Sequence, residues 1–149
     1  ESHFTYYETI GGGMGARPNL DGINAIHTHM TNTLNTPVES LEHNYPFRIS
    51  QYKIRPRSGG KGRHKGGHGI IRDYEFFQPA TVSILSDRRK QAPYGLKGGK
   101  KGQVGQNTLI SKGRKHKLPS KTTINVSSGD IVSIHTPGGG GYGRERSLK

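Results

Sequence analysis

Glycine places the strongest constraint on what this chain can fold into. It accounts for 23 of the 149 residues, and most of these glycines fall into blocks at residues 11–15, 59–69, 95–105 and 138–143. Glycine weakens the interior of helices and strands, and it is common in turns and where two backbones approach closely. The blocks therefore predict loops and turns between short regular elements, and no long helices.

The apolar content limits the core. Hydrophobic residues make up 28% of the chain, against roughly 45–50% in an ordinary globular domain when glycine is counted. We therefore expect a shallow core and a surface that docks on a partner. The chain has no cysteine, which excludes disulfides and Cys-based zinc chemistry. No apolar run is long enough to cross a membrane and no signal-peptide pattern is visible, so a cytoplasmic location is expected.

The charge is divided between two parts of the chain. Residues 1–50 hold two basic and five acidic residues, a net charge of −3, whereas residues 51–149 hold 21 basic and five acidic residues, a net charge of +16. Such a field attracts acidic or phosphate-rich partners. It is consistent with two uses, a surface that docks an acidic subunit and a face that binds nucleic acid.

Runs of β-branched and aromatic residues predict short strands. These lie at residues 4–10, 23–30, 47–54, 70–77, 80–86, 108–110, 122–126 and 131–135. A switch of apolar parity at Ser50-Gln51 predicts a β-bulge, and the last two strands are expected to form a hairpin. One short helix is predicted, with Thr36 as its cap, Pro37 at its first position and Glu39 completing a capping box.

These elements predict a mainly β fold, a single β-sandwich or barrel-like domain with a loop-rich N-terminal segment and one short helix. The domain is expected to span residues 1–149. Within it, residues 1–46 form the loop-rich segment that holds candidate site groups, and residues 47–149 form the β-rich, basic part.

Two histidines are candidate functional residues. On an extended segment, His27 and His29 face the same side, where they suit proton transfer or metal binding. No third metal ligand is fixed by spacing, so histidines with a purely structural role remain the alternative. The surrounding residues suit a surface that holds a polar ligand; they are Thr28, Thr31, Asn32, Thr33, Asn35 and Thr36.

Two glycine blocks have more than one interpretation. Residues 11–16 formally match a dinucleotide-binding pattern, but Pro18 and Asp21-Gly22 break the helix that this pattern requires. A turn whose backbone N–H groups approach an anion remains open. For residues 136–143 the alternatives are a flexible tail and a close-packed loop, and composition alone favours the tail.

Together the motifs resemble the C-terminal part of the hydantoinase B-type subunit in the hydantoinase B/oxoprolinase family. The strings that carry the resemblance are GGGMGAR at 11–17, HTHMTNTLNTPVE at 27–39, SGGKGRHKGGHGIIRDYEF at 58–76, LSDRRKQAPYGLKGG at 85–99 and HTPGGGGYG at 135–143. They cover nearly the whole chain. The resemblance implies an ATP-dependent hydantoinase/5-oxoprolinase-type complex that opens cyclic amide rings, of which this chain is a C-terminal piece or small subunit.

The resemblance also implies partners and cofactors. ATP is expected on a hydantoinase A-type subunit, and the ligands of a divalent metal mainly on a partner or on an upstream hydantoinase B-type chain, with no metal site assigned within this chain. The substrate class would be a small cyclic amide, and the isolated chain is expected to be inactive. A subunit of an acetone-type carboxylase is the alternative within the family. A small basic nucleic-acid-binding β protein is the alternative outside it.

Site residues follow from the matching motifs. His27, His29 and Arg17 are the expected catalytic residues: the histidines would transfer a proton or support a metal ligand, and Arg17 would hold a carboxylate or phosphoryl group. The expected substrate-binding residues are Gly12, Gly13, Met14, Thr31, Asn32 and Asn35. The N–H groups of Gly138, Gly139 and Gly140 are expected to contact phosphate.

Overall fold

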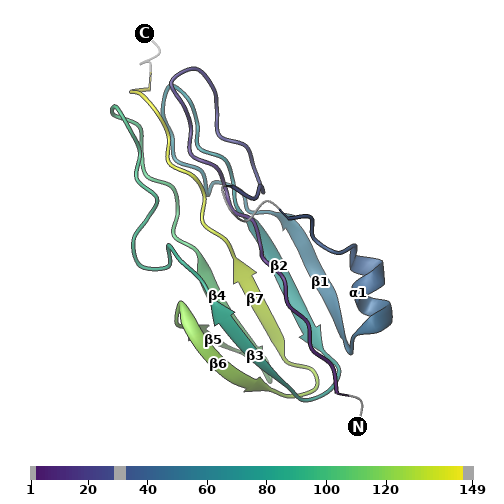
Figure 1. The fold of residues 1–149 in the computed structure, drawn as a ribbon. Coiled ribbons are helices and arrows are strands. Elements are labelled where there is room, and N and C mark those ends of the chain that lie inside the picture. The colour runs from purple at the N-terminus through teal and green to yellow at the C-terminus, as the bar shows by residue number, and fades with distance from the viewer. Residues whose placement is uncertain (1–2, 29–32, 146–149) are drawn as a thin grey trace.

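The computed structural model describes residues 3–28 and 33–145 and contains two antiparallel sheets and one helix (Figure 1). The large sheet has the strand order β1-β2-β7-β4-β5, and β3 pairs with β6 in a second, two-stranded sheet. The elements are α1 (Val38–Asn44), β1 (Phe47–Ile54), β2 (Ile70–Phe76), β3 (Ala80–Leu85), β4 (Gln106–Ser111), β5 (Arg114–Leu118), β6 (Lys121–Val126) and β7 (Ile131–His135). The mainly β prediction is confirmed, and both sheets are open rather than closed into a barrel.

One apolar cluster joins the two sheets and the helix. Its buried members are Leu41 from α1, Phe47, Phe76, Val132 and Ile134 from the large sheet, and Ile84 and Val126 from the small one. Alternate side chains of a strand point to opposite faces, so only one face of each sheet contributes to it. The N-terminal residues Phe4, Tyr6 and Ile10 pack against the same cluster.

The N-terminal segment is held on the large sheet by a buried ion pair. The guanidinium of Arg72, on β2, is fully buried, and its Nε lies 2.9 Å from Oε1 of Glu8. The hydroxyl of Tyr6 donates to Oε2 of Glu8 at 2.6 Å. Burial and this hydrogen bond raise the pKa of the Tyr6 hydroxyl. The ring of Tyr52 lies 4.4 Å from the Arg72 guanidinium, so the buried cation has a partner on more than one side.

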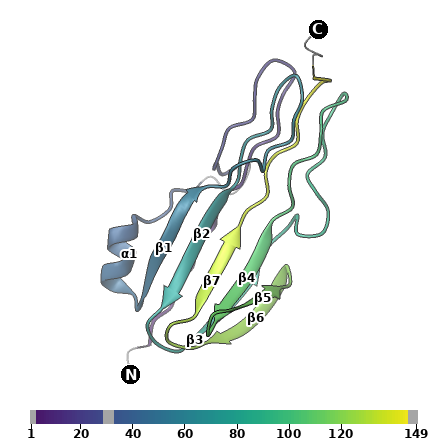
Figure 2. The same cartoon turned by 180° about the vertical axis from the view of Figure 1, so that it is seen from behind.

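The glycine-rich segments extend beyond the strand ends and pack against one another. Residues 11–26, 58–69, 93–105 and 136–143, called the glycine bundle below, run beside one another away from the large sheet (Figures 1 and 2). Backbone hydrogen bonds link them, among them the N–H of Gly13 to Pro137, of Gly67 to Met14 and of Gly139 to Gly67. In most of the bundle, the backbone of one segment therefore packs directly against the backbone of the next.

Close approach explains why glycine is needed at particular positions. A Cβ on Gly13 would overlap the carbonyl of Gly67, and a Cβ on Gly138 would overlap the carbonyl of Ser58. Residues 138–141 are buried. The interpretation of this segment as a flexible tail is therefore wrong, because composition does not show that other glycine segments pack on it.

Several local predictions need correction. The predicted hairpin of residues 122–126 with 131–135 does not form, because β6 pairs with β3 whereas β7 pairs with β2 and β4. Residues 4–10 are not a strand: their alternate side chains are buried as in one, but no ladder forms. Residues 23–28 have only an isolated bridge from Ile26 to Gly12.

Further differences concern α1 and β5. The helix begins at Val38 with Pro37 at its N-cap and no side-chain cap bond, so Thr36 is not the cap. The sequence does not predict β5, whose residues 114–117 are basic and exposed, since an edge strand in solvent needs no apolar alternation. The bulge at Ser50 is confirmed by the register shift between Ile49 and Gln51.

Candidate functional site

His27 lies at the base of the glycine bundle, directly after the bridge between Gly12 and Ile26. Its Nε2 lies 3.1 Å from the side-chain oxygen of Asn35. An amide oxygen only accepts hydrogen bonds, so this contact requires the proton on Nε2, and in the neutral imidazole Nδ1 then keeps its lone pair. Nδ1 is buried and has no hydrogen-bond partner among the described residues. The imidazole is thus oriented by Asn35 and presents a base, or a single metal-ligand nitrogen.

The other predicted residues of the same motif lie outside the described residues. These are His29, Thr31 and Asn32. Their predicted roles stay predictions, and the contact between His27 and Asn35 is the part of the motif whose geometry is known.

Arg17 is placed away from His27. The backbones of Arg17 and Leu20 pair in a tight turn at the tip of the hairpin-like arm, whose base is the bridge between Gly12 and Ile26. The Arg17 side chain is exposed, and its Nη2 lies 3.9 Å from the sulfur of Met14. Within this chain, Arg17 therefore faces the outer end of the glycine bundle, and His27 its inner end.

The structure brings together glycines predicted for substrate and for phosphate. A Cβ on Gly13 would overlap the backbone nitrogen of Gly139, and a Cβ on Gly139 would overlap the carbonyl of Met14. Their donors are already engaged: Gly13 donates to Pro137 and Gly139 to Gly67, each at 2.9 Å. These N–H groups hold the bundle together, and any anion contact would compete with those bonds.

Gly12, Gly138 and Gly140 complete the predicted glycine set. Gly12 accepts from Ile26 through its carbonyl, Gly138 donates to Gln103 at 3.2 Å, and the carbonyl of Gly140 accepts from Ala16 at 2.8 Å. Each of these groups lies in the bundle, and their predicted ligand contacts stay predictions.

A cationic cluster that sequence reasoning missed lies where the bundle joins the large sheet. We call Arg55, Arg89 and His135 the basic junction. Nη1 of Arg55 donates to the carbonyls of Val104 and Thr136, at 2.8 and 3.0 Å. In Arg89, Nε donates to the side-chain oxygen of Asn107 at 3.0 Å and Nη1 to the carbonyl of Asp87 at 2.7 Å.

Burial perturbs all three groups of the basic junction. It lowers the pKa of Arg89 to about 10, with a further contribution from the charge of Arg55, and it also lowers the pKa of Arg55. Burial, and then the charge of Arg55, lower the pKa of His135 below 6.5. The run Arg88-Arg89 is visible in the sequence, but nothing in it shows which of the two side chains turns inward.

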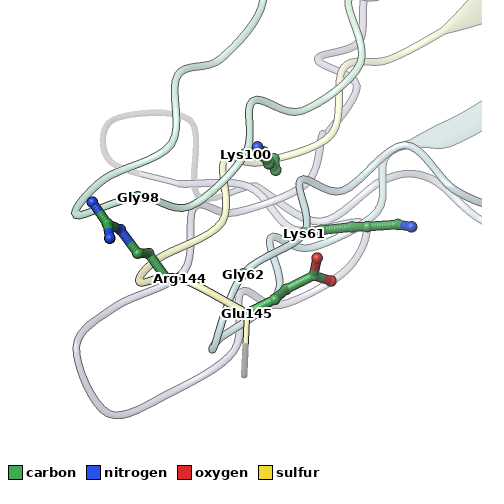
Figure 3. A pocket seen from close by; sticks show the side chains of 6 residues that line it. All are labelled: Lys61, Gly62, Gly98, Lys100, Arg144 and Glu145. Atoms are coloured by element: carbon green, nitrogen blue, oxygen red, sulfur yellow. The ribbon is translucent and has the colours of Figure 1, made fainter. Parts of the chain in front are cut away.

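A surface pocket of about 430 Å³ lies at the outer end of the bundle (Figure 3). It is lined by Lys61, Gly62, Gly98, Lys100, Arg144 and Glu145. Its lysines are exposed, and the Arg144 side chain lies beside Gly98 (Figure 3). Exposed cations of this kind make a positive surface rather than a shaped site.

A metal site would need several His, Asp or Glu side chains close together. Among residues 3–28 and 33–145, no three His, Asp or Glu side chains are grouped so that they could hold a metal ion. Nδ1 of His27 offers one nitrogen, and one ligand does not make a site. Within the same residues, no helix is long and apolar enough to cross a membrane.

Comparison with known proteins places these features in a family. The sequence matches the hydantoinase B/oxoprolinase family over residues 1–145. It is 49% identical to 5-oxoprolinase 1 of Arabidopsis thaliana, over 94% of this chain and 11% of that protein. The ATP-dependent caprolactamase from Pseudomonas jessenii has a TM-score of 0.81 at 28% identity, over 91% of this chain and 24% of that one. A nucleotide-free acetone carboxylase shares the fold, with a TM-score of 0.75 at 17% identity over 91% of this chain and 23% of that one.

Proposed function

We propose, because the chain belongs to the hydantoinase B/oxoprolinase family, that it forms one wall of the active site in an ATP-dependent enzyme that opens cyclic amide rings. It would act as the C-terminal piece or a small subunit of a hydantoinase/5-oxoprolinase-type complex. Similar proteins are named 5-oxoprolinase and ATP-dependent caprolactamase, which supports this choice. The chain spans 11% of the first and 24% of the second, so the other components would come from further polypeptide.

The observation that carries the proposal is the buried Nδ1 of His27, which has no hydrogen-bond partner among the residues that the structure describes. Opening an amide ring requires a proton to leave the attacking water and another to reach the departing nitrogen. A neutral imidazole held in one tautomer does both in turn. Asn35 fixes that tautomer through Nε2, so in our proposal His27 is the catalytic proton carrier and Asn35 is its positioning residue.

The proposed roles of the other site residues follow from the chemical groups that they expose. Arg17 is exposed at the outer end of the arm, where its guanidinium would hold a carboxylate or phosphoryl group brought by another component. The glycines of residues 12–13 and 138–140 would shape the wall. His29 is proposed as a further catalytic residue, and Thr31, Asn32 and Met14 as substrate-binding residues.

ATP and a divalent metal would be supplied largely by other components. We propose that a hydantoinase A-type subunit binds ATP, whose hydrolysis drives ring opening. The metal ligands would come mainly from the upstream hydantoinase B-type chain, since the described residues of this chain build no metal site. A cytoplasmic location fits these partners and belongs to the proposal.

The test is His27→Gln in the complete enzyme supplied with ATP and a cyclic amide. Loss of a proton carrier should lower kcat by about 10²- to 10⁴-fold, with an unchanged melting temperature. His43→Gln, at an exposed position near the end of α1, is the matched control and should retain activity. An unimpaired His27→Gln enzyme would remove His27 from the mechanism.

A carboxylase is the alternative within the family, favoured by the fold shared with acetone carboxylase. The same purified complex separates the two reactions. Ring opening without uptake of labelled bicarbonate supports the amidohydrolase. Bicarbonate fixation onto a ketone, without ring opening, would support the carboxylase instead.

A further inference from the structure

The basic junction holds two half-buried guanidiniums that form no ion pair among the described residues, and the charge of Asp87 acts on Arg89 only from beyond ion-pair distance. Arg55 and Arg89 contact carbonyl or amide oxygens, and neither lies within ion-pair distance of a carboxylate in that part of the chain. Asp87 reaches Arg89 through its backbone carbonyl, while its side chain is exposed. Cations removed from water are costly unless a negative group compensates them.

The donors left over are numerous. A guanidinium has five N–H groups. In Arg55 only Nη1 is engaged, and in Arg89 only Nε and Nη1. Within the described residues, Nη2 of each side chain has no partner, although both side chains are ordered by their other bonds. Two oriented guanidiniums with free N–H groups match the geometry of carboxylate and phosphate oxygens.

The backbone is adapted to bring the two cations together. Both reach the start of β4, Arg55 at the carbonyl of Val104, just before the strand, and Arg89 at the side chain of Asn107, in its second position. Between them lies Gly105, where a Cβ would overlap the guanidinium of Arg89. Glycine at this position leaves room for that guanidinium. His135 pairs with Gln106 across the β4–β7 ladder and adds an imidazole beside Arg55.

We propose that the basic junction is a binding site for a small oxyanion, a carboxylate or phosphate group held between Arg55 and Arg89. It is built from other residues than His27 and Asn35, and its test does not depend on ring-opening chemistry. Both cations sit at the base of the bundle on fixed partners, whereas the lysines of the outer pocket are exposed. A ligand bound here would compensate the mutual repulsion of Arg55 and Arg89.

The test measures anion binding directly, on the protein as purified from its source. Sodium phosphate and sodium acetate are titrated calorimetrically at constant ionic strength. We expect saturable binding of at least one of them, weakened about tenfold or more in Arg89→Gln, because a charge-assisted hydrogen bond is lost. Arg114→Gln removes the same charge from the exposed strand β5 and should leave affinity within about twofold.

Further variants keep the result interpretable. Arg89→Lys preserves the charge but not the planar fork, so it should bind with intermediate affinity, and thermal melting confirms that each variant is folded. Tighter phosphate binding identifies a phosphoryl ligand, and tighter acetate binding a carboxylate. Absence of saturable binding of either anion, or equal affinity in the unaltered protein, Arg89→Gln and Arg89→Lys, overturns the proposal. Ring opening is not a readout, so failure here leaves the proposed function intact.

Discussion

Among single residues, Glu8 is notable because the side chains of Tyr6 and Arg72 both bind its carboxylate. Its carboxylate accepts from the hydroxyl of Tyr6 and pairs with the fully buried guanidinium of Arg72. A buried pair adds little compared with an apolar pair of the same size, but breaking it leaves one charge buried alone. The consequence of a substitution therefore depends on which charge is left.

We predict that Glu8→Gln lowers the free energy of unfolding by about 3–5 kcal/mol, because Arg72 keeps its charge without a counter-charge. Urea unfolding followed by circular dichroism measures this. Glu39→Gln makes the same change at an exposed position in the first turn of α1 and should shift the value by no more than about 0.5 kcal/mol. Equal urea midpoints for the two variants would show that the ion pair has no net role.

The candidate site shows how far residue-level inference reaches. The spacing of the two histidines in residues 27–29 is visible in the sequence, so His27 could be singled out. Its hydrogen bond to Asn35 joins two residues eight positions apart in the chain. No local sequence pattern predicts that the intervening loop brings them together. Arg88 and Arg89 are equivalent as neighbours in a charge run, and only the position of Asn107 decides which one turns inward.

At the scale of elements, runs of β-branched and aromatic residues predicted most of the strands. The strands at residues 47–54, 70–76, 80–85 and 131–135 lie within the ranges predicted from those runs. Which strands pair with one another was not predictable from these runs. β6 and β7 are separated by a short turn, yet β6 pairs with β3 whereas β7 inserts between β2 and β4, so that both backbone edges of β7 are hydrogen-bonded.

Substitution within the glycine bundle should be costly where backbones touch. We predict that Gly138→Ala lowers the free energy of unfolding by about 1–3 kcal/mol, since its Cβ would displace the Ser58 carbonyl. Gly15→Ala is the control: its Cβ would lie 3.9 Å from the nearest atom, the carbonyl oxygen of Gly140. Thermal melting and limited proteolysis of both variants measure the difference, and equal stability would argue against backbone packing at residue 138.

For the whole molecule, the division of charge bears on how the chain associates. Residues 51–149 carry a net charge of +16, and β5 presents basic side chains at the edge of the large sheet. This edge fits an acidic partner subunit in the proposed complex. The nucleic-acid-binding alternative uses the same edge, so binding measurements must distinguish them.

We predict that the chain by itself neither hydrolyses ATP nor opens cyclic amides, and that activity requires a hydantoinase A-type subunit and the upstream hydantoinase B-type chain. Coupled ATPase assays with and without those partners measure this. Labelled RNA provides the second arm. Tight RNA binding that falls steeply between 50 and 200 mM salt, together with no activity after reconstitution, would favour the nucleic-acid-binding alternative.

The glycine bundle also imposes an order on folding. Residues 13 and 139 are neighbours in space although nearly the whole described chain separates them. Closing so long a loop costs entropy before any contact compensates it, and such non-local contacts form slowly. During synthesis, the first glycine block can pair with Ile23, Ile26 and Gly67, but its contacts with the last block must wait until that block has left the ribosome. The strands around β1 and β2 can pair much earlier, so the bundle is the part of this chain that closes last.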